Sequence, residues 1–491
     1  MMYFLPCQMR VCYLYEKSIH HQIEKGILMG FALRTPAAER HFSSELSLDA
    51  IGQSVPLETI ESVLKEHQIK ETRQRKLNMV SVVLLVIAMN LYTRRSIGSV
   101  MKKISFGLRY IWPEEDISAP NDSAICYRRY QLGAKPMVEL FHQVCQPMAT
   151  DETPGANLFG LRAVAIDGTV EDVADTDENV RVFGRYSTDE NASPFPQAKA
   201  VYLVECGTHA IIDAGLWPCR TSERVGGFRM LRSIEEGMLV MWDRGLHDYQ
   251  MILGVRKRQA HVLSRLPDSV KPRPIRWLKD RSYIAYLTPK DYSCRDQKRH
   301  WIKVRIIEYT ITQAMLEGYG EVHRLVTTLL DPKAYPALDL ACAYHERWEI
   351  EMVIDEMDTH QRLASRPFRS LLPIGVIQEF YGMLIAHYAV RFLMHQAAVE
   401  ASIDPDRLSF VNALHVIKDS IPFFQITAKE QLPSLYARML SDIAKTRLPK
   451  RRFRSNPRVV KRRCSKFARK REQHYGSPQP KRTFRLSVGL I

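Results

Sequence analysis

Residues 161–167, LRAVAID, decide the fold, because they follow a helical stretch of sequence and begin a run of short apolar segments. AVYLVEC at 200–206, HAIIDAGL at 209–216 and MLVMWD at 238–243 have the same character, and turn residues separate them. Short apolar or β-branched segments between turn residues predict β-strands. We therefore expect a mixed α/β sheet to begin at residue 161.

Further strands and then helices follow. Four strand candidates lie in a block of basic composition, at residues 261–266, 281–287, 301–309 and 321–330. After Pro336 the apolar spacing becomes helical, first in DLACAYHERWEIEMVIDEMDTH and then in GVIQEFYGMLIAHYAVRFLMHQ. The sequence thus predicts a sheet that a β-rich insertion interrupts and that later elements complete.

Two of the predicted strands end in an aspartate that is followed by a turn. Asp167 precedes Gly168, and Asp243 precedes Arg244 and Gly245. Carboxylates at the ends of neighbouring strands can meet at one edge of a sheet, where they suit a hard divalent cation. A strand-final aspartate is also a common turn former, so neither residue alone identifies a site.

A third acidic candidate lies in the helical segment YHERWEIEMVIDEMD at residues 344–358. At about 100° per residue, Tyr344, Arg347, Glu351 and Asp358 fall on one stripe of the helix. Glu351 is placed to complete a metal site, while Tyr344 and Arg347 are placed to hold a phosphate. The alternative is a ladder of i, i+4 ion pairs on a solvated helix face.

The net charge of +16 is concentrated at the C-terminal end. Residues 445–491 contain 17 of the 70 Lys and Arg residues and one of the 54 acids, so the rest of the chain is balanced. Residues 256–305 form a second basic zone with 15 bases and 4 acids. Such zones are typical of polyanion binders, because each neutralised phosphate releases counterions. A tail that only aids solubility is the alternative.

The region before residue 150 has a helical pattern. The segments SAICYRRYQLG and MVELFHQVC are two short predicted helices, separated by Gly133 and Pro136. They resemble a helix-turn-helix reader of DNA, with Arg128 and Arg129 as candidate DNA-reading residues, or else they form an ordinary helical hairpin.

Membrane insertion and structural zinc are not expected. The longest apolar run, at residues 79–92, is shorter than the ~20 residues that a membrane span needs, so we predict a buried helix. The nine cysteines are scattered and form no Cys-x-x-Cys pair, which fits a reducing cytoplasm.

Taken together, the motifs resemble the DDE transposases of bacterial insertion sequences, specifically the insertion sequence 4 family. Its first motif, Asp-Gly-Thr, is matched at residues 167–169, and its second, Asp-Arg-Gly, at residues 243–245. The marker helix of the family reads Tyr, two residues, Arg, three residues, Glu, six residues, Lys. Tyr344, Arg347 and Glu351 match its first three positions. The resemblance spans roughly residues 45–485.

The resemblance implies a ribonuclease-H-like core that cleaves DNA and transfers strands at insertion-sequence ends. Asp167, Asp243 and Glu351 would bind two Mg²⁺ ions, for which Mn²⁺ can substitute, and Tyr344 and Arg347 would bind DNA phosphates. The implied partners are double-stranded DNA, as terminal inverted repeats and target DNA, and a second copy of the chain in a homodimer on paired ends. A bacterial cytoplasmic protein associated with the nucleoid is expected.

One position departs from the family pattern, because Asp358 stands where the family has lysine. The exchange replaces attraction for a phosphate with repulsion. Either a neighbouring base compensates for it, or the chain is a catalytically inactive DNA-binding remnant of a transposase. A related metal-dependent nuclease that only hydrolyses DNA is a further alternative.

The predicted organisation has six parts. They are an N-terminal lead with a short helix (1–70), a helical DNA-binding domain (71–150), the first part of the catalytic core (151–255), a basic β-rich insertion (256–330), the second part of the core (331–440) and a basic tail (441–491).

Overall fold

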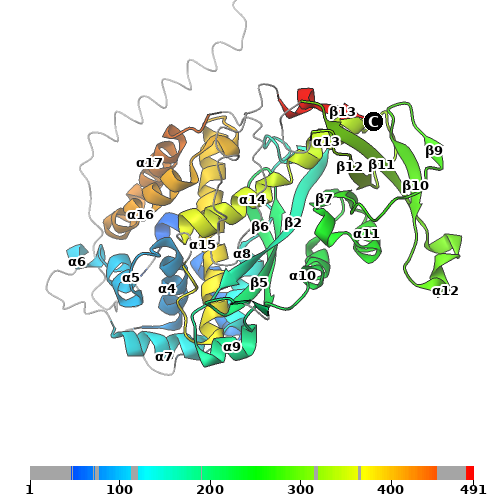
Figure 1. The fold of residues 1–491 in the computed structure, drawn as a ribbon. Coiled ribbons are helices and arrows are strands. Elements are labelled where there is room, and N and C mark those ends of the chain that lie inside the picture. The colour runs from blue at the N-terminus through cyan, green and yellow to red at the C-terminus, as the bar shows by residue number, and fades with distance from the viewer. Residues whose placement is uncertain are drawn as a thin grey trace, which may run out of the picture.

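The computed structural model describes residues 46, 48–69, 71, 77–111, 120–188, 191–313, 319–362, 366–449 and 483–491. Most of the predicted lead at 1–70 and most of the predicted basic tail at 441–491 lie outside the described residues. Helices gather on one side of the molecule, and a long sheet extends from them to the opposite side, where the C-terminus lies (Figure 1).

One large sheet of eleven strands forms the β half of the molecule. Its strands are β1 (Asn157–Leu158), β2 (Leu161–Asp172), β5 (Gln197–Glu205), β6 (Ala210–Pro218), β7 (Met238–Trp242), β8 (His261–Arg265), β9 (Arg276–Trp277), β10 (Tyr283–Leu287), β11 (Ile302–Ile311), β12 (His323–Thr327) and β13 (Val488–Leu490). A separate small sheet contains β3 (Ser187–Thr188) and β4 (Asn191–Ala192). All the strands predicted between residues 161 and 330 are present, which confirms the mixed α/β fold.

The main path of the sheet has the order β6-β5-β2-β7-β8-β12-β11-β10-β9. β5 is antiparallel to both of its neighbours, β6 and β2, whereas β7 is parallel to β2 and β8 is parallel to β7. From β8 onward every pairing is antiparallel. The carboxyl ends of β2, β7 and β8 therefore lie at the same edge of the sheet. Loops at this edge of parallel strands commonly carry functional residues.

The predicted insertion at 256–330 is continuous with the sheet. β8 follows α11 (Tyr249–Arg256) and pairs with β7, so it belongs to the central part of the sheet. β9 to β12 then extend the same sheet, with α12 (Tyr292–Arg295) in the connection between β10 and β11. The β-rich extension thus begins after β8 rather than at residue 256.

Six α-helices precede the sheet in the described part of the chain. They are α3 (Leu57–Glu66), α4 (Met79–Leu91), α5 (Ile97–Ile104), α6 (Leu108–Ile111), α7 (Asp122–Leu132) and α8 (Lys135–Val144). α4 is buried over almost its whole length, and the side chain of Asn78 caps it by accepting a hydrogen bond from the Ser81 amide at 2.8 Å. The prediction of a buried helix is confirmed. Among the described residues, none of the helices has the length and apolar character to cross a membrane.

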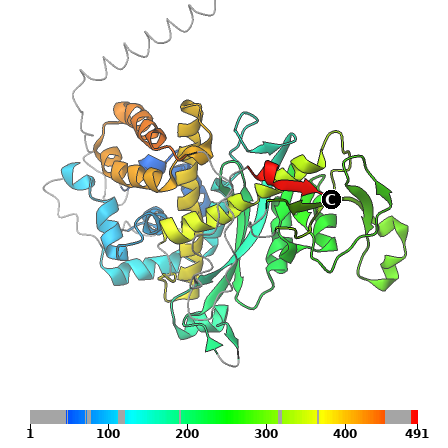
Figure 2. The ribbon, with the colours of Figure 1, turned by 45° about the horizontal axis from the view of Figure 1, so that its top comes forward.

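The long helix α15 (Pro373–Glu400) joins the two halves of the molecule. It packs against α4 and α8, against α16 (Phe410–Ile426) and α17 (Leu432–Lys445), and against β6 (Figures 1 and 2). Gly382 allows α15 to approach α4 closely, because a Cβ there would lie 2.8 Å from Cγ1 of Val86. The N-terminal helices therefore share one hydrophobic core with the rest of the chain.

Candidate active site

Asp167 and Asp243 lie next to each other near the middle of the sheet. The parallel register pairs Ile166 of β2 with Trp242 of β7, so each aspartate is the next residue of its chain segment. β7 ends at Trp242, but β2 continues to Asp172 because β5 keeps pairing with it. The prediction that Asp167 ends its strand is wrong, although the register places the two aspartates at neighbouring positions of adjacent chain segments.

The Asp-Arg-Gly turn fixes the second carboxylate through backbone hydrogen bonds. Asp243 caps the short 3₁₀ helix η3 (Arg244–Leu246), and its Oδ1 accepts from the amides of Gly245 at 2.8 Å and Leu246 at 3.4 Å. A carboxylate held in this way is oriented before any ligand arrives.

The predicted helix at 339–360 is divided into three pieces. α13 (Ala337–His345) and α14 (Trp348–Asp355) are separated at Arg347, and the π-helical turn η5 (Glu356–Gln361) follows α14 directly. Arg347 donates from Nη1 to Oδ2 of Asp167 at 3.2 Å and from Nη2 to Oε1 of Glu351 at 2.9 Å. One guanidinium thus bridges a carboxylate of the sheet and a carboxylate of the helix.

The charges of this bridge are partly shielded from water. Burial raises the pKa of Asp167 to about 6, although Arg347 and the Gly168 amide act in the opposite direction, and Glu223 and Asp243 add to the increase. Burial acts to lower the pKa of Arg347, but Tyr344, Glu351 and Asp167 raise it above its ordinary value, so the guanidinium stays charged. The site therefore contains more carboxylates than one arginine neutralises.

Glu223 is a fourth carboxylate at this site, and it is not among the residues predicted from the sequence. It begins α10 (Glu223–Met230), and its side chain lies over Gly168, where a Cβ would come within 2.6 Å of Oε1. Burial raises the pKa of Glu223, and Asp243 raises it further. An acid in the first turn of a helix is the common capping pattern, so the sequence offered no signal that distinguished this residue.

Tyr344 lies behind the bridge. Its hydroxyl donates to the backbone oxygen of Trp242 at 3.3 Å, and its ring centroid is 5.9 Å from the Arg347 guanidinium carbon. Burial raises the pKa of Tyr344 to about 12. In this arrangement the tyrosine orients the arginine, and the hydroxyl faces β7 rather than solvent.

Asp358 lies in η5, and the wide turn ends the α-helical stripe that carries Glu351. The Asp358 carboxylate is 10% exposed and lies 3.6 Å from Nη1 of Arg362, which also forms an ion pair with Glu171. The sequence predicted Asp358 on one stripe with Glu351, and this is corrected by the π-helical turn. Arg362 neutralises this carboxylate within the protein, whereas compensation for the missing lysine by a base that binds DNA stays a prediction.

Arg128 and Arg129 of α7 are buried, so the prediction that they read DNA is corrected. Arg128 forms an ion pair with Glu71 and donates to the backbone oxygen of Leu77 at 3.1 Å. Arg129 donates to Ser370 at 3.0 Å, and to a backbone and a side-chain oxygen of α15. Both guanidinium groups are used to join α7 to its neighbours, because buried donors require partners within the protein.

The donor chemistry of the site fits a hard divalent cation. Asp167, Asp243 and Glu351 offer only oxygen ligands, which Mg²⁺ and Mn²⁺ prefer. Burial raises the pKa of Asp167, and a divalent cation bound to its carboxylate would favour the charged form. Arg347 lies between two of these carboxylates, so a bound cation and the guanidinium would compete for them.

Two families of known proteins match the chain. Residues 45–142 match the family described as "Insertion element 4 transposase N-terminal", and residues 158–388 match the family described as "Transposase DDE domain". The second match includes β2, β7 and α14, and with them Asp167, Asp243 and Glu351.

Two proteins of Escherichia coli (strain K12) are similar to this chain. "Transposase InsG for insertion sequence element IS4" is 25% identical over 431 residues, which are 87% of this chain and 95% of the relative. "Putative transposase InsZ" is 26% identical over 146 residues, which are 30% of this chain and 49% of that protein.

A solved structure also aligns with the chain. The cryo-EM structure of the piggyBac transposase synaptic complex with hairpin DNA gives a TM-score of 0.39 and 11% identity, over 83% of this chain and 86% of that chain.

Proposed function

The chain belongs to the DDE transposases of insertion sequence 4, and on that premise we propose that Asp167, Asp243 and Glu351 are its catalytic residues. As a transposase, the protein acts in DNA transposition of an insertion sequence. The chemistry proposed here is cleavage of a DNA strand at the end of the element, followed by transfer of the new 3′-hydroxyl to another strand.

The bridge made by Arg347 carries this proposal. A ladder of ion pairs on a solvated helix face would join Arg347 to Glu351 alone, because both lie on the same segment. The second bond runs to Asp167, which comes from a strand. A helix whose guanidinium bonds both its own carboxylate and a strand-borne aspartate supports an assembled site rather than a surface ladder.

We propose that Mg²⁺ ions are held by Asp167, Asp243 and Glu351. When bound, they would activate the attacking oxygen and stabilise the leaving oxygen of the phosphodiester. Arg347, released from the carboxylates, would donate its paired N–H groups to a DNA phosphate. Tyr344 would position that guanidinium through its ring, and it contacts DNA itself only if its hydroxyl leaves the Trp242 backbone oxygen.

The strand order supports a ribonuclease-H-like core within this fold. Three antiparallel strands, β6, β5 and β2, are followed by β7 and β8, which are parallel to β2. We propose that these five strands form the ribonuclease-H-like core, and that the catalytic aspartates come from β2 and β7 within it.

The β-rich extension supports contact with DNA. Lys271, Arg273, Arg276 and Lys279 are exposed along it, and Trp277 among them is 60% exposed. Exposed bases neutralise phosphates, and an exposed indole can stack on an unpaired base. We propose terminal inverted repeats and target DNA as the ligands, bound by a homodimer on paired ends close to the nucleoid.

The test is Mg²⁺-dependent cleavage and strand transfer on a labelled duplex that carries the ends of the element flanking the gene. Asp167→Ala, Asp243→Ala and Glu351→Ala should each abolish both steps and leave DNA binding largely intact. Glu152→Ala, which removes an exposed acid before the sheet, should keep both activities. Cleavage that persists in all three variants would contradict the assignment.

The same assay separates the alternatives. A nuclease that only hydrolyses would release cleaved strands without joined products. An inactive DNA-binding remnant would bind the ends and cleave with neither Mg²⁺ nor Mn²⁺.

A further inference from the structure

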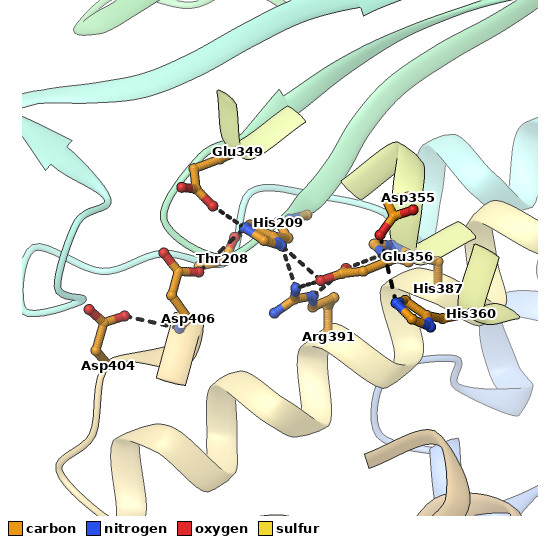
Figure 3. A network of polar contacts seen from close by, with 11 residues as sticks. Thr208, His209, Glu349, Asp355, Glu356, His360, His387, Arg391, Asp404 and Asp406 are labelled. Carbon is orange, nitrogen blue, oxygen red and sulfur yellow. Dashed lines mark hydrogen bonds and ion pairs between the residues drawn. The ribbon is translucent and has the colours of Figure 1, made fainter. Parts of the chain in front are cut away.

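Three side chains with metal-binding groups meet on the side of α14 away from the candidate active site. They are His209 in the turn between β5 and β6, Glu349 in α14, and Asp406 in the short helix η6 (Pro405–Arg407); together we call them the His209 cluster. Nε2 of His209 lies 2.7 Å from Oε2 of Glu349 and 3.4 Å from Oδ1 of Asp406. Figure 3 shows the three side chains converging from three separate segments.

Glu351 of the active site and Glu349 of the His209 cluster face different directions. Glu349 precedes Glu351 by two residues, which is a rotation of about 200° around an α-helix. Glu351 accordingly bonds to Arg347, whereas Glu349 bonds to His209. The His209 cluster is therefore a second set of ligands, and no step proposed for the active site uses it.

One carboxylate oxygen in the cluster has no hydrogen bond. Oδ1 of Asp406 is buried and accepts no hydrogen bond from the described residues, and it faces His209. A buried carboxylate oxygen without a donor costs free energy that a proton or a cation would recover. This oxygen therefore points to a missing positive ligand.

The charges around the cluster point the same way. Glu349, Glu356 and Asp406 supply three carboxylates, and Arg391 supplies one guanidinium. Burial lowers the pKa of His387, which also contacts Glu356, so this imidazole adds no positive charge near neutral pH. Three carboxylates facing one guanidinium leave an excess of negative charge in the interior, which a divalent cation would balance.

The orientation of His209 leaves Nε2 for the ligand. Nδ1 of His209 lies 3.2 Å from Oε1 of Glu356, which can only accept, and it also contacts the Arg391 guanidinium. Nε2 is the ring nitrogen that faces Glu349 and Asp406. Nε2 carries either a proton, donated to Glu349, or a metal ion. A contact made by the ring nitrogen that does not bind the metal fixes the ring orientation of a metal-binding histidine.

We propose that His209, Glu349 and Asp406 form a structural site for a divalent transition metal ion, with Zn²⁺ as the favoured ion. One imidazole and two carboxylates offer nitrogen and oxygen atoms of the kinds that bind Zn²⁺, and a water would complete a tetrahedral set. Ligands at about 2.0–2.2 Å from such an ion lie roughly 3–3.5 Å apart, so the His209–Glu349 contact has to open slightly. The ion would tie the β5–β6 turn and the connection between α15 and α16 to the helix that carries Glu351.

The first test measures Zn²⁺ affinity of the full-length protein by competition with a chelator, with excess Mg²⁺ present to occupy the active-site carboxylates. We expect one Zn²⁺ per chain, and an affinity that falls about tenfold or more in His209→Gln and in Asp406→Asn. His261→Gln, a half-buried histidine of β8, should bind as the unaltered protein does.

The second test identifies the ligand atoms. Pulsed EPR of the chain loaded with Mn²⁺ should show coupling to an imidazole nitrogen, which the all-carboxylate active site cannot provide. The coupling should persist in Asp167→Asn and vanish in His209→Gln. If His209→Gln does not fold, Asp406→Asn keeps the side-chain shape and tests the same site. Absence of nitrogen coupling and of retained Zn²⁺ in the unaltered protein, or coupling that survives in a folded His209→Gln, overturns the proposal.

Discussion

Nη1 of Arg347 lies 3.2 Å from Oδ2 of Asp167, so a cation at the start of α14 is bonded to a carboxylate in β2. The same guanidinium holds Glu351, and both carboxylates are proposed ligands of Mg²⁺. In this state the arginine provides the positive charge that the metal would provide during catalysis. The two cations are therefore expected to compete, and this relation can be measured.

Arg347→Ala should make the protein more dependent on Mg²⁺ for its stability. In EDTA the variant should lose about 3 kcal/mol of unfolding free energy, because the removal of one partner leaves a partly buried charge uncompensated. Mg²⁺ should raise its Tm more than that of the unaltered protein, since no guanidinium competes for the carboxylates. Thermal unfolding with and without Mg²⁺ checks this.

Arg244→Ala is the control for this measurement, because Arg244 is a half-exposed arginine beside Asp243 that pairs with the exposed Asp268. Its Mg²⁺-dependent shift of Tm should match that of the unaltered protein. Equal shifts in all three proteins would show that the guanidinium and the ion do not share ligands.

Asp358→Lys should destabilise the fold, although it restores the residue that the family has at this position. The new ammonium would face Arg362, which lies 3.6 Å from the present carboxylate, and the unfolding free energy should fall by about 1–3 kcal/mol. Asp355→Lys, at a position that is 49% exposed on the same segment, should change it little. Urea unfolding distinguishes the two, and an Asp358→Lys variant as stable as the unaltered protein contradicts the role of this ion pair.

Glu223→Ala should raise the Mg²⁺ concentration needed for cleavage a few-fold without abolishing the reaction. Its carboxylate adds to the negative charge that surrounds Asp167, but it lies beside the proposed ligands rather than among them. Glu236→Ala, at an exposed position before β7, is the matched control. Metal titrations of the initial cleavage rate provide the comparison, and an unchanged midpoint in Glu223→Ala rejects the expectation.

Mild acid should weaken the fold in part through His247. Burial lowers the pKa of His247 from 6.5 to about 4, so the folded state binds fewer protons there than the unfolded state. The contribution of His247 to the free energy of unfolding is therefore fully present above about pH 6.5, and it is lost as the pH falls toward 4. His247→Gln should lose less stability between pH 7 and pH 5 than the unaltered protein.

Urea midpoints at the two pH values measure this difference. His360→Gln, which removes a half-exposed histidine, should retain the pH dependence of the unaltered protein. A His247→Gln variant with an unchanged pH dependence would rule out this contribution.

The strands and their order of appearance followed from local sequence, because short apolar segments between turn residues need no distant partner to be recognised. The division of the helix at Arg347 could not be predicted from local sequence, since YHERWEIEMVIDEMD contains neither Pro nor Gly. Bonds to distant residues divide it: Arg347 is held by Asp167, and Glu356, where the π-helical turn begins, is held by Arg391. Local propensity cannot anticipate such contacts.

The two arginines of α7 illustrate the same limit. An arginine between apolar residues looks available for DNA, yet Arg128 pairs with Glu71 and Arg129 bonds to Ser370, far away in sequence. The positions of Asp167 and Asp243 were easier to predict, because adjacent parallel strands bring residues at equivalent positions together whatever surrounds them.

The packing of α4 against α15 has a consequence for how the protein is made. α4 ends at Leu91 and is apolar on all sides, whereas the helix that covers it begins at Pro373. During synthesis, α4 leaves the ribosome long before α15 exists, so the nascent chain carries an uncovered apolar helix for most of its translation. A message that ends before codon 373 should therefore yield a product that aggregates or is retained by chaperones, rather than a folded DNA-binding fragment.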